Sequence, residues 1–308
     1  MKFNKKLTIE ASGKINLYLN VQKNDRTDGY HEIKSIMQSV SLSDELCFEV
    51  FHKDYGVASH SENGNDIFIT SNDVEIPLGE KNLVHKAALL ILNNFNLRKK
   101  YNIKINIHKR IPVSAGLAGG STNAAATLVA LQKLFNLNIG ESELIEMADS
   151  VGSDVPFCIS GGTALVEGKG EKISALPDLP FYWVVLASNG RKFLSGEVYE
   201  KFDLIGKEKK SIHDDLINNI FDRKFTDFLN NLGNDLEDVV VTEDSIVSSL
   251  KEKALSLGAI SAQMTGSGPT VFALCRDLKV AREVHKGLKE LSSRVFLSYT
   301  IPNSLNFI

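Results

Sequence analysis

Residues 116–120 form a glycine-rich segment, GLAGG, that is followed at once by the hydroxyl side chains of Ser121 and Thr122. Small residues let a ligand approach the backbone closely. The alanine- and leucine-rich residues 124–135 predict a helix directly after this segment, and free N–H groups at the start of a helix favour an anion. The combination predicts a phosphate-binding loop. The alternative is a structural glycine turn that packs the helix against a sheet.

The glycine segment differs from two common nucleotide-binding motifs. It lacks the Gly-Lys-Ser/Thr ending of a P-loop and the Gly-x-Gly-x-x-Gly pattern of dinucleotide-binding domains. A second glycine-rich turn, residues 266–268, is followed by Pro269 and lies between predicted strands at residues 261–265 and 270–275. Without further context, this turn could simply join the two strands.

Hydrophobic periodicity predicts the elements that must position these loops. Residues 14–21 alternate between apolar and polar side chains, which is typical of a half-buried strand. Residues 83–95 have helical spacing, and Ser142 is predicted to cap another helix. Further strands are expected after Tyr30 and at residues 42–51, 101–108, 163–166, 181–187 and 294–300, and further helices at residues 142–151, 214–257 and 278–291. The mixture predicts an α+β chain with a domain boundary between residues 155 and 180.

Composition excludes several classes of function. The chain has 308 residues, enough for two domains, and its 35 Lys+Arg and 38 Asp+Glu give a net charge of −3. That charge argues against broad binding of nucleic acid or of an anionic membrane. Three scattered cysteines predict no zinc site and suit a reducing compartment. The longest apolar run, residues 181–187, is far shorter than the roughly 20 residues that span a bilayer, so we expect a cytoplasmic protein.

Three ordered segments resemble the motifs of the GHMP kinases, the superfamily of galactokinase, homoserine kinase, mevalonate kinase and phosphomevalonate kinase. Residues 112–121 (PVSAGLAGGS) resemble the second motif, residues 264–270 (MTGSGPT) resemble the third, and residues 14–17 (KINL) resemble the first. Each segment alone is a weak signal, but the ordered set is specific.

The resemblance implies the two-domain α+β GHMP kinase fold. Its N-terminal, ribosomal-S5-like ATP-binding domain would span residues 1–160, and its C-terminal, ferredoxin-like α/β domain would span residues 161–308 and contribute to the substrate cleft. An ATP-dependent kinase with a small-molecule substrate follows from this resemblance, as a monomer or a homodimer.

Other segments resemble one branch of the superfamily. These are residues 28–31 (DGYH), 152–157 (GSDVPF) and 165–171 (LVEGKGE). Members of the branch use ATP to phosphorylate the 2-hydroxyl of 4-diphosphocytidyl-2-C-methyl-D-erythritol in non-mevalonate isoprenoid precursor synthesis. The resemblance extends from about residue 8 to about residue 300.

The family resemblance implies the catalytic roles. Asp154 would be the base, and Lys14 would lie beside it, orient it and stabilise charge on the substrate hydroxyl. A positioned carboxylate can accept a hydroxyl proton, and a neighbouring ammonium favours its ionised form. Each residue also has a simpler interpretation, because Asp154 could be a turn residue and Lys14 a solvated strand residue.

The same resemblance implies the residues that bind ATP and the substrate. Mg²⁺ would be held largely by ATP oxygens, with a hydroxyl from Ser121 or Thr122 and no dedicated metal site. The residues expected around ATP are Asn82, Leu83, Pro112, Val113, Ser114, Ala115, Gly116, Leu117, Ala118, Gly119, Gly120, Ser121 and Thr122. Those expected around the substrate are Asn16 at the methylerythritol hydroxyls, Tyr30, His31 and Tyr199 at the cytosine, and Gly266, Ser267 and Gly268 at the diphosphate. Tyr30 and His31 could also be ordinary hairpin residues, and Tyr199 could be a core residue.

Three positions depart from the family pattern. Ala118 stands where many members have a third glycine, and residues 11–13 (ASG) replace the commoner Ala-Pro-Ala. Residues 188–194 (SNGRKFL) lack the usual proline and Val-Ser-Thr pattern, which affects the expected substrate pocket more than the ATP site. The alternatives are therefore a superfamily kinase with another acceptor, a catalytically idle paralogue, or an RNA-binding module, against which the net charge argues.

Overall fold

The structure is a computed structural model that describes residues 3–22, 29–53, 66–207 and 209–308. Asp28, in the turn predicted before the second strand, lies outside the described residues. None of the helices in the described part is long and apolar enough to cross a membrane.

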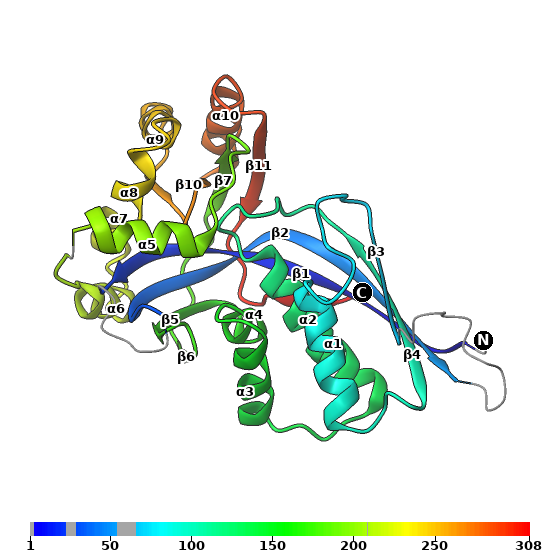
Figure 1. Cartoon of the computed structure of the whole chain (residues 1–308). Coiled ribbons are helices and arrows are strands. Elements are labelled where there is room, and N and C mark those ends of the chain that lie inside the picture. The colour runs from blue at the N-terminus through cyan, green and yellow to red at the C-terminus, as the bar shows by residue number, and fades with distance from the viewer. Residues whose placement is uncertain (1–2, 23–28, 54–65, 208) are drawn as a thin grey trace.

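Two long antiparallel strands run through the middle of the molecule (Figure 1). They are β1 (Phe3–Val21) and β2 (Ile33–His52). The two strands expected after Tyr30 and at residues 42–51 are therefore one continuous strand. The sequence did not show this because the residues between them are buried on both faces of the sheet, so no alternation marks a strand there.

The pairing of β1 with β2 is interrupted near the predicted catalytic lysine. The register shifts between Ser12 and Lys14 and again between Asn16 and Tyr18. Such bulges bend a strand locally and change the direction of its side chains. Lys14 and Asn16 therefore lie on a short stretch of strand that two irregularities set apart.

β1 and β2 belong to a large sheet that contains eight of the described strands. The order is β12-β1-β2-β4-β3, with β5 on β2, β6 on β5 and β8 on β1. The remaining bounds are β3 (Ile67–Ser71), β4 (Tyr101–His108), β5 (Thr163–Gly168), β6 (Lys172–Ala175), β8 (Gly233–Asn234) and β12 (Leu305–Phe307). The predicted strands at residues 101–108 and 163–166 are confirmed as β4 and β5, and β5 forms a hairpin with β6. β3, β8 and β12 are short and were not predicted.

Four helices pack below the long strands in Figure 1. Their bounds are α1 (Leu83–Asn94), α2 (Gly119–Phe135), α3 (Glu141–Val151) and α4 (Val155–Ser160). They share one hydrophobic core with the inner faces of β1, β2, β3 and β4. The prediction that Ser142 caps its helix is wrong, because α3 begins one residue earlier and Gly140 is the N-cap.

A smaller antiparallel sheet rises on the other side, in the order β11-β7-β10-β9. Its strands are β7 (Trp183–Ser188), β9 (Ser261–Met264), β10 (Val271–Cys275) and β11 (Arg294–Tyr299). The helices of this half are α5 (Ser195–Ile205), α6 (His213–Phe221), α7 (Phe225–Asn230), α8 (Glu237–Val241), α9 (Ile246–Ser256) and α10 (Leu278–Leu288). A core cluster joins one face of this sheet to α5, α8, α9 and α10.

A third core cluster connects the two sheets. It contains Ile15 and Leu17 of β1, Ile36 of β2, and Val184 and Leu186 of β7, all fully buried. The two halves are therefore packed against each other through apolar side chains, and the segment that contains Lys14 lies at their junction.

The strands of the two sheets indicate where in the sequence the first half of the molecule ends and the second begins. β5 and β6, which follow residue 160, pair in the large sheet through β2. The first strand of the small sheet begins at Trp183. The boundary at 160/161 stays a prediction, and the sheets favour a division between Ala175 and Trp183.

Candidate active site

A cavity of about 1010 Å³ lies where the two halves meet. Its walls come from β1 and β2, the glycine segment and the start of α2, the loop before α4, the first turns of α5, and the turn before β10. Segments that are more than 100 residues apart in the sequence therefore line one space.

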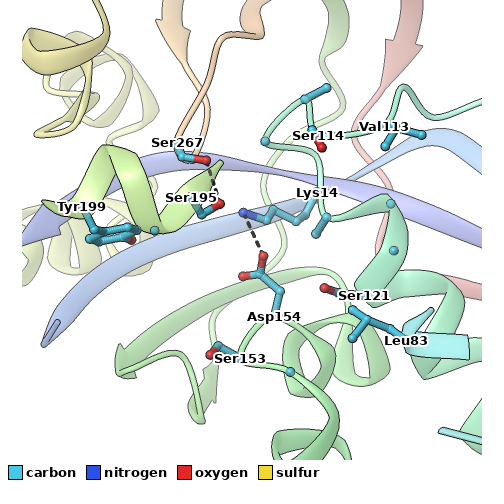
Figure 2. Close-up of a pocket in the computed structure, with 18 of the residues that line it drawn as sticks. Lys14, Leu83, Val113, Ser114, Ser121, Ser153, Asp154, Ser195, Tyr199 and Ser267 are labelled. Atoms are coloured by element: carbon cyan, nitrogen blue, oxygen red, sulfur yellow. Dashed lines mark hydrogen bonds and ion pairs between the residues drawn. The ribbon is translucent and has the colours of Figure 1, made fainter. Parts of the chain in front are cut away.

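Lys14 and Asp154 face each other in this cavity (Figure 2). Lys14 Nζ lies 3.7 Å from Asp154 Oδ2, and it also donates a hydrogen bond to Asn16 Oδ1 at 2.7 Å. The lysine side chain is only 5% exposed, whereas that of Asp154 is 35% exposed. The ammonium is thus held in place by Asn16 and the carboxylate, and the carboxylate remains open to a ligand.

The loop before α4 leaves the carboxylate of Asp154 available. Asp154 is the N-cap residue of α4, but its side chain accepts no hydrogen bond from the first turn of that helix. Pro156 occupies that first turn, where it lacks an N–H to donate. Asp154 therefore occupies a capping position without acting as a cap, and its carboxylate points toward Lys14 instead.

The glycine segment runs directly into α2, as the sequence predicts. Ala118, at its end, has a left-handed conformation with φ 55°, which costs an L-residue with a side chain about 1–2 kcal/mol. A Cβ atom at Gly120 would meet only Leu83 Cδ1, at 3.8 Å, so the space above Gly120 is open. The start of α2 thus presents bare backbone to the cavity, an arrangement that suits a phosphate group.

Thr265 joins three of the predicted motifs. Its hydroxyl accepts a hydrogen bond from Asn16 N at 2.9 Å and lies 3.4 Å from Gly116 O. At Gly116, with φ 74°, an added Cβ would be 2.4 Å from Thr265 O. The close approach of the glycine segment to the strand turn therefore requires glycine at this position.

A buried ion pair supports the glycine segment from behind. Asp44, which is fully buried, pairs with the ammonium of Lys109 and accepts hydrogen bonds from Arg110 N at 2.8 Å and Ile111 N at 2.9 Å. Lys109 lines the cavity, and a Cβ at Gly119 would lie 2.9 Å from its Nζ. The sequence analysis did not identify this lysine, whose positive charge lies beside the start of α2.

Asn82 and Leu83 lie at the start of α1, on the same side of the cavity as the glycine segment. Asn82 Oδ1 accepts a hydrogen bond from Val84 N at 2.9 Å, and Asn82 Nδ2 donates to Pro77 O at 2.7 Å. The amide of Asn82 is therefore occupied as a helix cap. Leu83 presents its side chain to the cavity. Contact of these residues with adenine stays a prediction.

Aromatic and charged side chains form the opposite end of the cavity. The rings of His31 and Tyr199 lie 4.9 Å apart, and Tyr30 is 49% exposed. Burial raises the pKa of Tyr199, and nearby Asp154 adds to this effect, so the phenol stays neutral. Lys169 Nζ lies 5.4 Å from the centre of the Tyr30 ring. This end therefore combines flat apolar faces with polar groups.

Two further charged or polar contacts shape this end. Lys169 pairs with Asp149 at 3.1 Å, and the hydrogen bond that its ammonium donates to the Asp149 carboxylate raises the pKa of Lys169, which therefore stays cationic. Ser195, the first residue of α5, lies 3.0 Å from Ser267 between their hydroxyl oxygens (Figure 2). The first turn of α5 thus opens into the cavity beside the turn that was predicted to bind a diphosphate.

The cavity brings together most, but not all, of the predicted site residues. Leu117, Thr122 and Gly268 do not line it. Leu117 packs into the core cluster between the sheets, and Thr122 is fully buried within α2. The structure also adds lining residues that the sequence analysis missed, among them Lys109, Asn123, Lys169, Ser195 and Asp203. Of these, only Lys169 lies in a recognisable sequence pattern, because it stands between two glycines in the family-like segment 165–171.

Two family models match this chain. The family model described as the GHMP kinases N terminal domain matches residues 82–162, and the model described as GHMP kinases C terminal matches residues 217–293. The first match contains the glycine segment and Asp154, and the second contains the turn at residues 266–268. The GHMP kinase fold and the α+β class expected from the sequence are confirmed.

Several curated relatives align with nearly the whole chain. A 4-diphosphocytidyl-2-C-methyl-D-erythritol kinase from Enterococcus faecalis is 40% identical over 294 residues, which cover 94% of this chain and 98% of the relative. Relatives with the same name from Caldanaerobacter subterraneus and Clostridium botulinum are 38% and 39% identical, and cover 98% and 96% of this chain and 100% of each relative.

Solved structures give the same result for the fold. A crystal structure of 4-(cytidine 5'-diphospho)-2C-methyl-D-erythritol kinase has a TM-score of 0.75 and 26% identity, and covers 95% of this chain and 98% of that chain. A homoserine kinase from Cytophaga hutchinsonii also has a TM-score of 0.75, at 17% identity, with 100% and 99% of the two chains covered. The second likeness concerns the fold alone.

Proposed function

The chain belongs to the 4-diphosphocytidyl-2-C-methyl-D-erythritol kinase family of the GHMP kinases, and from this membership we propose its reaction and the roles of its residues. The protein uses ATP to phosphorylate the 2-hydroxyl of 4-diphosphocytidyl-2-C-methyl-D-erythritol, a step of non-mevalonate isoprenoid precursor synthesis. The observation that carries this proposal is the Lys14–Asp154 pair, which lies between a backbone cradle and an aromatic pocket in one cavity.

Asp154 is the proposed base of the reaction. Its partly exposed carboxylate would accept the proton of the substrate 2-hydroxyl as that oxygen attacks the γ-phosphorus of ATP. Lys14, already hydrogen-bonded to Asn16, would hold the carboxylate in position and stabilise negative charge on the attacking oxygen. In phosphoryl transfer the protein mainly positions groups and neutralises charge, and this pair can do both.

ATP would lie along the glycine segment with its phosphates at the start of α2. The open space above Gly120 and the ammonium of Lys109 support this position. The other expected ATP contacts along residues 112–121 line the same wall, apart from Leu117. The cradle offers backbone N–H groups and a helix N-terminus, which bind phosphate without needing a net positive charge on the protein.

Magnesium is compatible with the donors that the chain offers. Among the described residues there is no cluster of three or more His, Cys, Asp or Glu side chains that could hold a metal. Mg²⁺ keeps several waters and commonly binds through substrate phosphates with few protein ligands. Ser121 lines the cavity, whereas Thr122 is fully buried, so Ser121 is the proposed hydroxyl ligand. When bound, the ion would neutralise charge on the β- and γ-phosphoryl oxygens.

The substrate would occupy the opposite end of the cavity. Tyr30, His31 and Tyr199 are proposed to hold the cytosine, because their rings are the flat faces available there. Asn16 would reach the methylerythritol hydroxyls next to Lys14. Gly266 and Ser267, both in the cavity wall, would contact the diphosphate. Gly268 does not line the cavity, and we do not include it in the substrate contacts.

The location of the protein, its partners and its oligomeric state are also proposals. The three cysteines are free thiols, as is usual in the reducing cytoplasm, where we place the protein. Its net charge of −3 gives no support for nucleic-acid binding. We propose that the protein acts as a monomer or a homodimer, since one chain supplies all parts of the described cavity.

An ADP-release assay tests the proposed reaction. Purified protein with Mg-ATP should release ADP when 4-diphosphocytidyl-2-C-methyl-D-erythritol is added, and mass spectrometry should find one added phosphoryl group on the substrate. Mevalonate, homoserine and galactose serve as acceptor controls and should give no ADP above background. Turnover with one of these controls, but not with the cytidyl substrate, would show that the protein has a different acceptor.

A further inference from the structure

The side chain of Asp203 contacts the ring of His31 at the substrate end of the cavity. His31 Nε2 and Asp203 Oδ1 are 2.8 Å apart, and the histidine side chain is only 6% exposed. A carboxylate oxygen accepts hydrogen bonds, so Nε2 is the ring nitrogen that carries the hydrogen in this contact. Asp203 therefore determines both the orientation of the ring and the position of its hydrogen.

Asp203 reaches His31 from a helix that belongs to the other half of the molecule. Tyr199 and Asp203 are four residues apart on α5, so they lie on the same face of the helix. Both contact His31, one through its ring at 4.9 Å and one through its carboxylate. On another face of α5, Val198 and Phe202 are buried in the core cluster of the small sheet. Because these two residues anchor α5 in the core, the helix holds Tyr199 and Asp203 against His31.

We propose that Asp203 is a positioning residue for the cytidine end of the substrate. It acts through His31, whose ring it fixes, and it works together with Tyr199 to hold α5 against the segment that leads into β2. The proposal rests on the function proposed above, because it assigns the His31 end of the cavity to the nucleobase. Asp203 takes no part in the proton transfer, which belongs to Asp154.

Steady-state kinetics separates positioning from catalysis. Asp203→Asn should raise the KM for the cytidyl substrate by about tenfold, the effect expected from losing one charge-assisted hydrogen bond, with kcat and the KM for ATP changed less than about twofold. Glu197→Gln, which removes one charge from an exposed position on the same helix, is the matched control and should leave all three values unchanged. An unchanged KM in Asp203→Asn, or an equal loss for ATP, would contradict the proposal.

Calorimetry with cytidine 5'-diphosphate provides a test that does not depend on turnover. With the ATP site filled by ADP, the wild-type protein should bind this probe and Asp203→Asn should bind it about tenfold more weakly. If the wild-type protein binds the probe but shows no turnover, the proposed reaction fails and the Asp203 proposal is still decided by the variant. If the wild-type protein does not bind the probe, the position of the nucleobase, and with it the Asp203 proposal, is wrong.

Two further measurements show whether Asp203 acts through His31. In a double-mutant cycle, Asp203→Asn should cause no further loss when His31→Gln is already present. Nitrogen-15 NMR of the histidine rings should find the hydrogen of His31 on Nε2 in the wild-type protein, and this preference should weaken in Asp203→Asn. Additive losses, or a hydrogen on Nδ1 in the wild-type protein, would contradict the mechanism.

Discussion

The two ends of the cavity are built from different parts of the chain. At the proposed ATP end, the wall is mostly backbone: the glycine segment, the first turn of α2, and a left-handed Ala118, with the side chains of Leu83 and Lys109 beside them. At the substrate end, the wall consists of side chains that other side chains hold in place, such as His31 with Asp203 and Lys169 with Asp149. The first end depends mainly on local backbone conformation, which the Lys109–Asp44 pair and the close approach of Gly116 to Thr265 support. The second end depends on contacts between the side chains themselves.

This difference shows which parts of the site can tolerate which changes. A backbone cradle is sensitive to any added side-chain atom, because the ligand occupies the space that a Cβ would take. A wall of paired side chains is sensitive to loss of a partner, because the remaining group is left unsatisfied or misplaced. Lys14 and Asp154 lie between the two ends and belong to neither.

The largest effect is expected at this central pair. Asp154→Asn removes the proposed base while keeping the size of the side chain, so kcat should fall by about 10²–10⁴-fold. The affinity for ATP, measured by calorimetry, should change less than about threefold, because the proposed phosphate contacts are with backbone. Asp178→Asn, an exposed position outside the cavity, is the control. Retained turnover in Asp154→Asn would remove Asp154 from the role of base.

Two glycine variants test the backbone end. Gly120→Ala places a methyl group in open space, with no contact closer than 3.8 Å, so the fold should keep its stability or gain up to about 1 kcal/mol from helix propensity. The same methyl group would occupy the phosphate cradle, and the KM for ATP should rise by roughly tenfold or more. The KM for the cytidyl substrate should stay the same.

Gly116→Ala is the matched comparison for Gly120→Ala. Its Cβ would be 2.4 Å from Thr265 O at a positive φ, so this variant should lose more than about 1 kcal/mol of unfolding free energy. Urea unfolding of both variants measures the difference. Equal stability of the two variants would show that the close approach of the glycine segment to Thr265 is not required.

The contrast between the two ends also explains what could be predicted from the sequence. The glycine segment and the start of α2 are contiguous, so their residue types predict a phosphate cradle, with a structural glycine turn as the alternative. Asp203 and Lys109 have no such local signal, because each acquires its role from a partner far away in the chain, His31 and Asp44 respectively.

The same distinction holds for the fold, whose regular elements could be predicted and whose irregular ones could not. Regular periodicity predicted α1 and β4 closely, since both have one buried face. β2 was divided into two strands because part of it is buried on both faces, and the edge strands β3 and β12 are too short to show a period. The pairing of Lys14 with Asp154 came from the family resemblance, because 140 residues separate them and no local pattern connects them.

A smaller effect is expected from the aromatic part of the substrate end. Tyr199→Leu keeps an apolar side chain but removes the flat ring beside His31, so the KM for the cytidyl substrate should rise by about 2- to 10-fold. The KM for ATP should not change, because Tyr199 lies at the other end of the cavity. Tyr299→Leu, at an exposed aromatic residue of the small sheet, is the control. A matching rise in the KM for ATP would show that the two ends are coupled.

The smallest effect is expected at an exposed ion pair outside the cavity, which joins the segment before α1 to the segment before α5. Lys192 Nζ lies 2.9 Å from Glu75 Oε1, with exposed fractions of 45% and 39% for the two side chains. Glu75 precedes cavity residues of the ATP end, and Lys192 lies in the segment 188–194 that departs from the family pattern. Because an exposed pair is screened by water and salt, Lys192→Met should cost less than about 1 kcal/mol of unfolding free energy.

Salt provides the decisive comparison for this pair. The small loss in Lys192→Met, and any change in the KM for either ligand, should disappear in 1 M NaCl, where the Debye length falls to about 3 Å. The charge-reversed double variant, Lys192→Glu with Glu75→Lys, should recover the wild-type values at low salt. A KM effect larger than about threefold that persists at high salt would mean that this contact closes the cavity, and the two ends could then no longer be treated as independent.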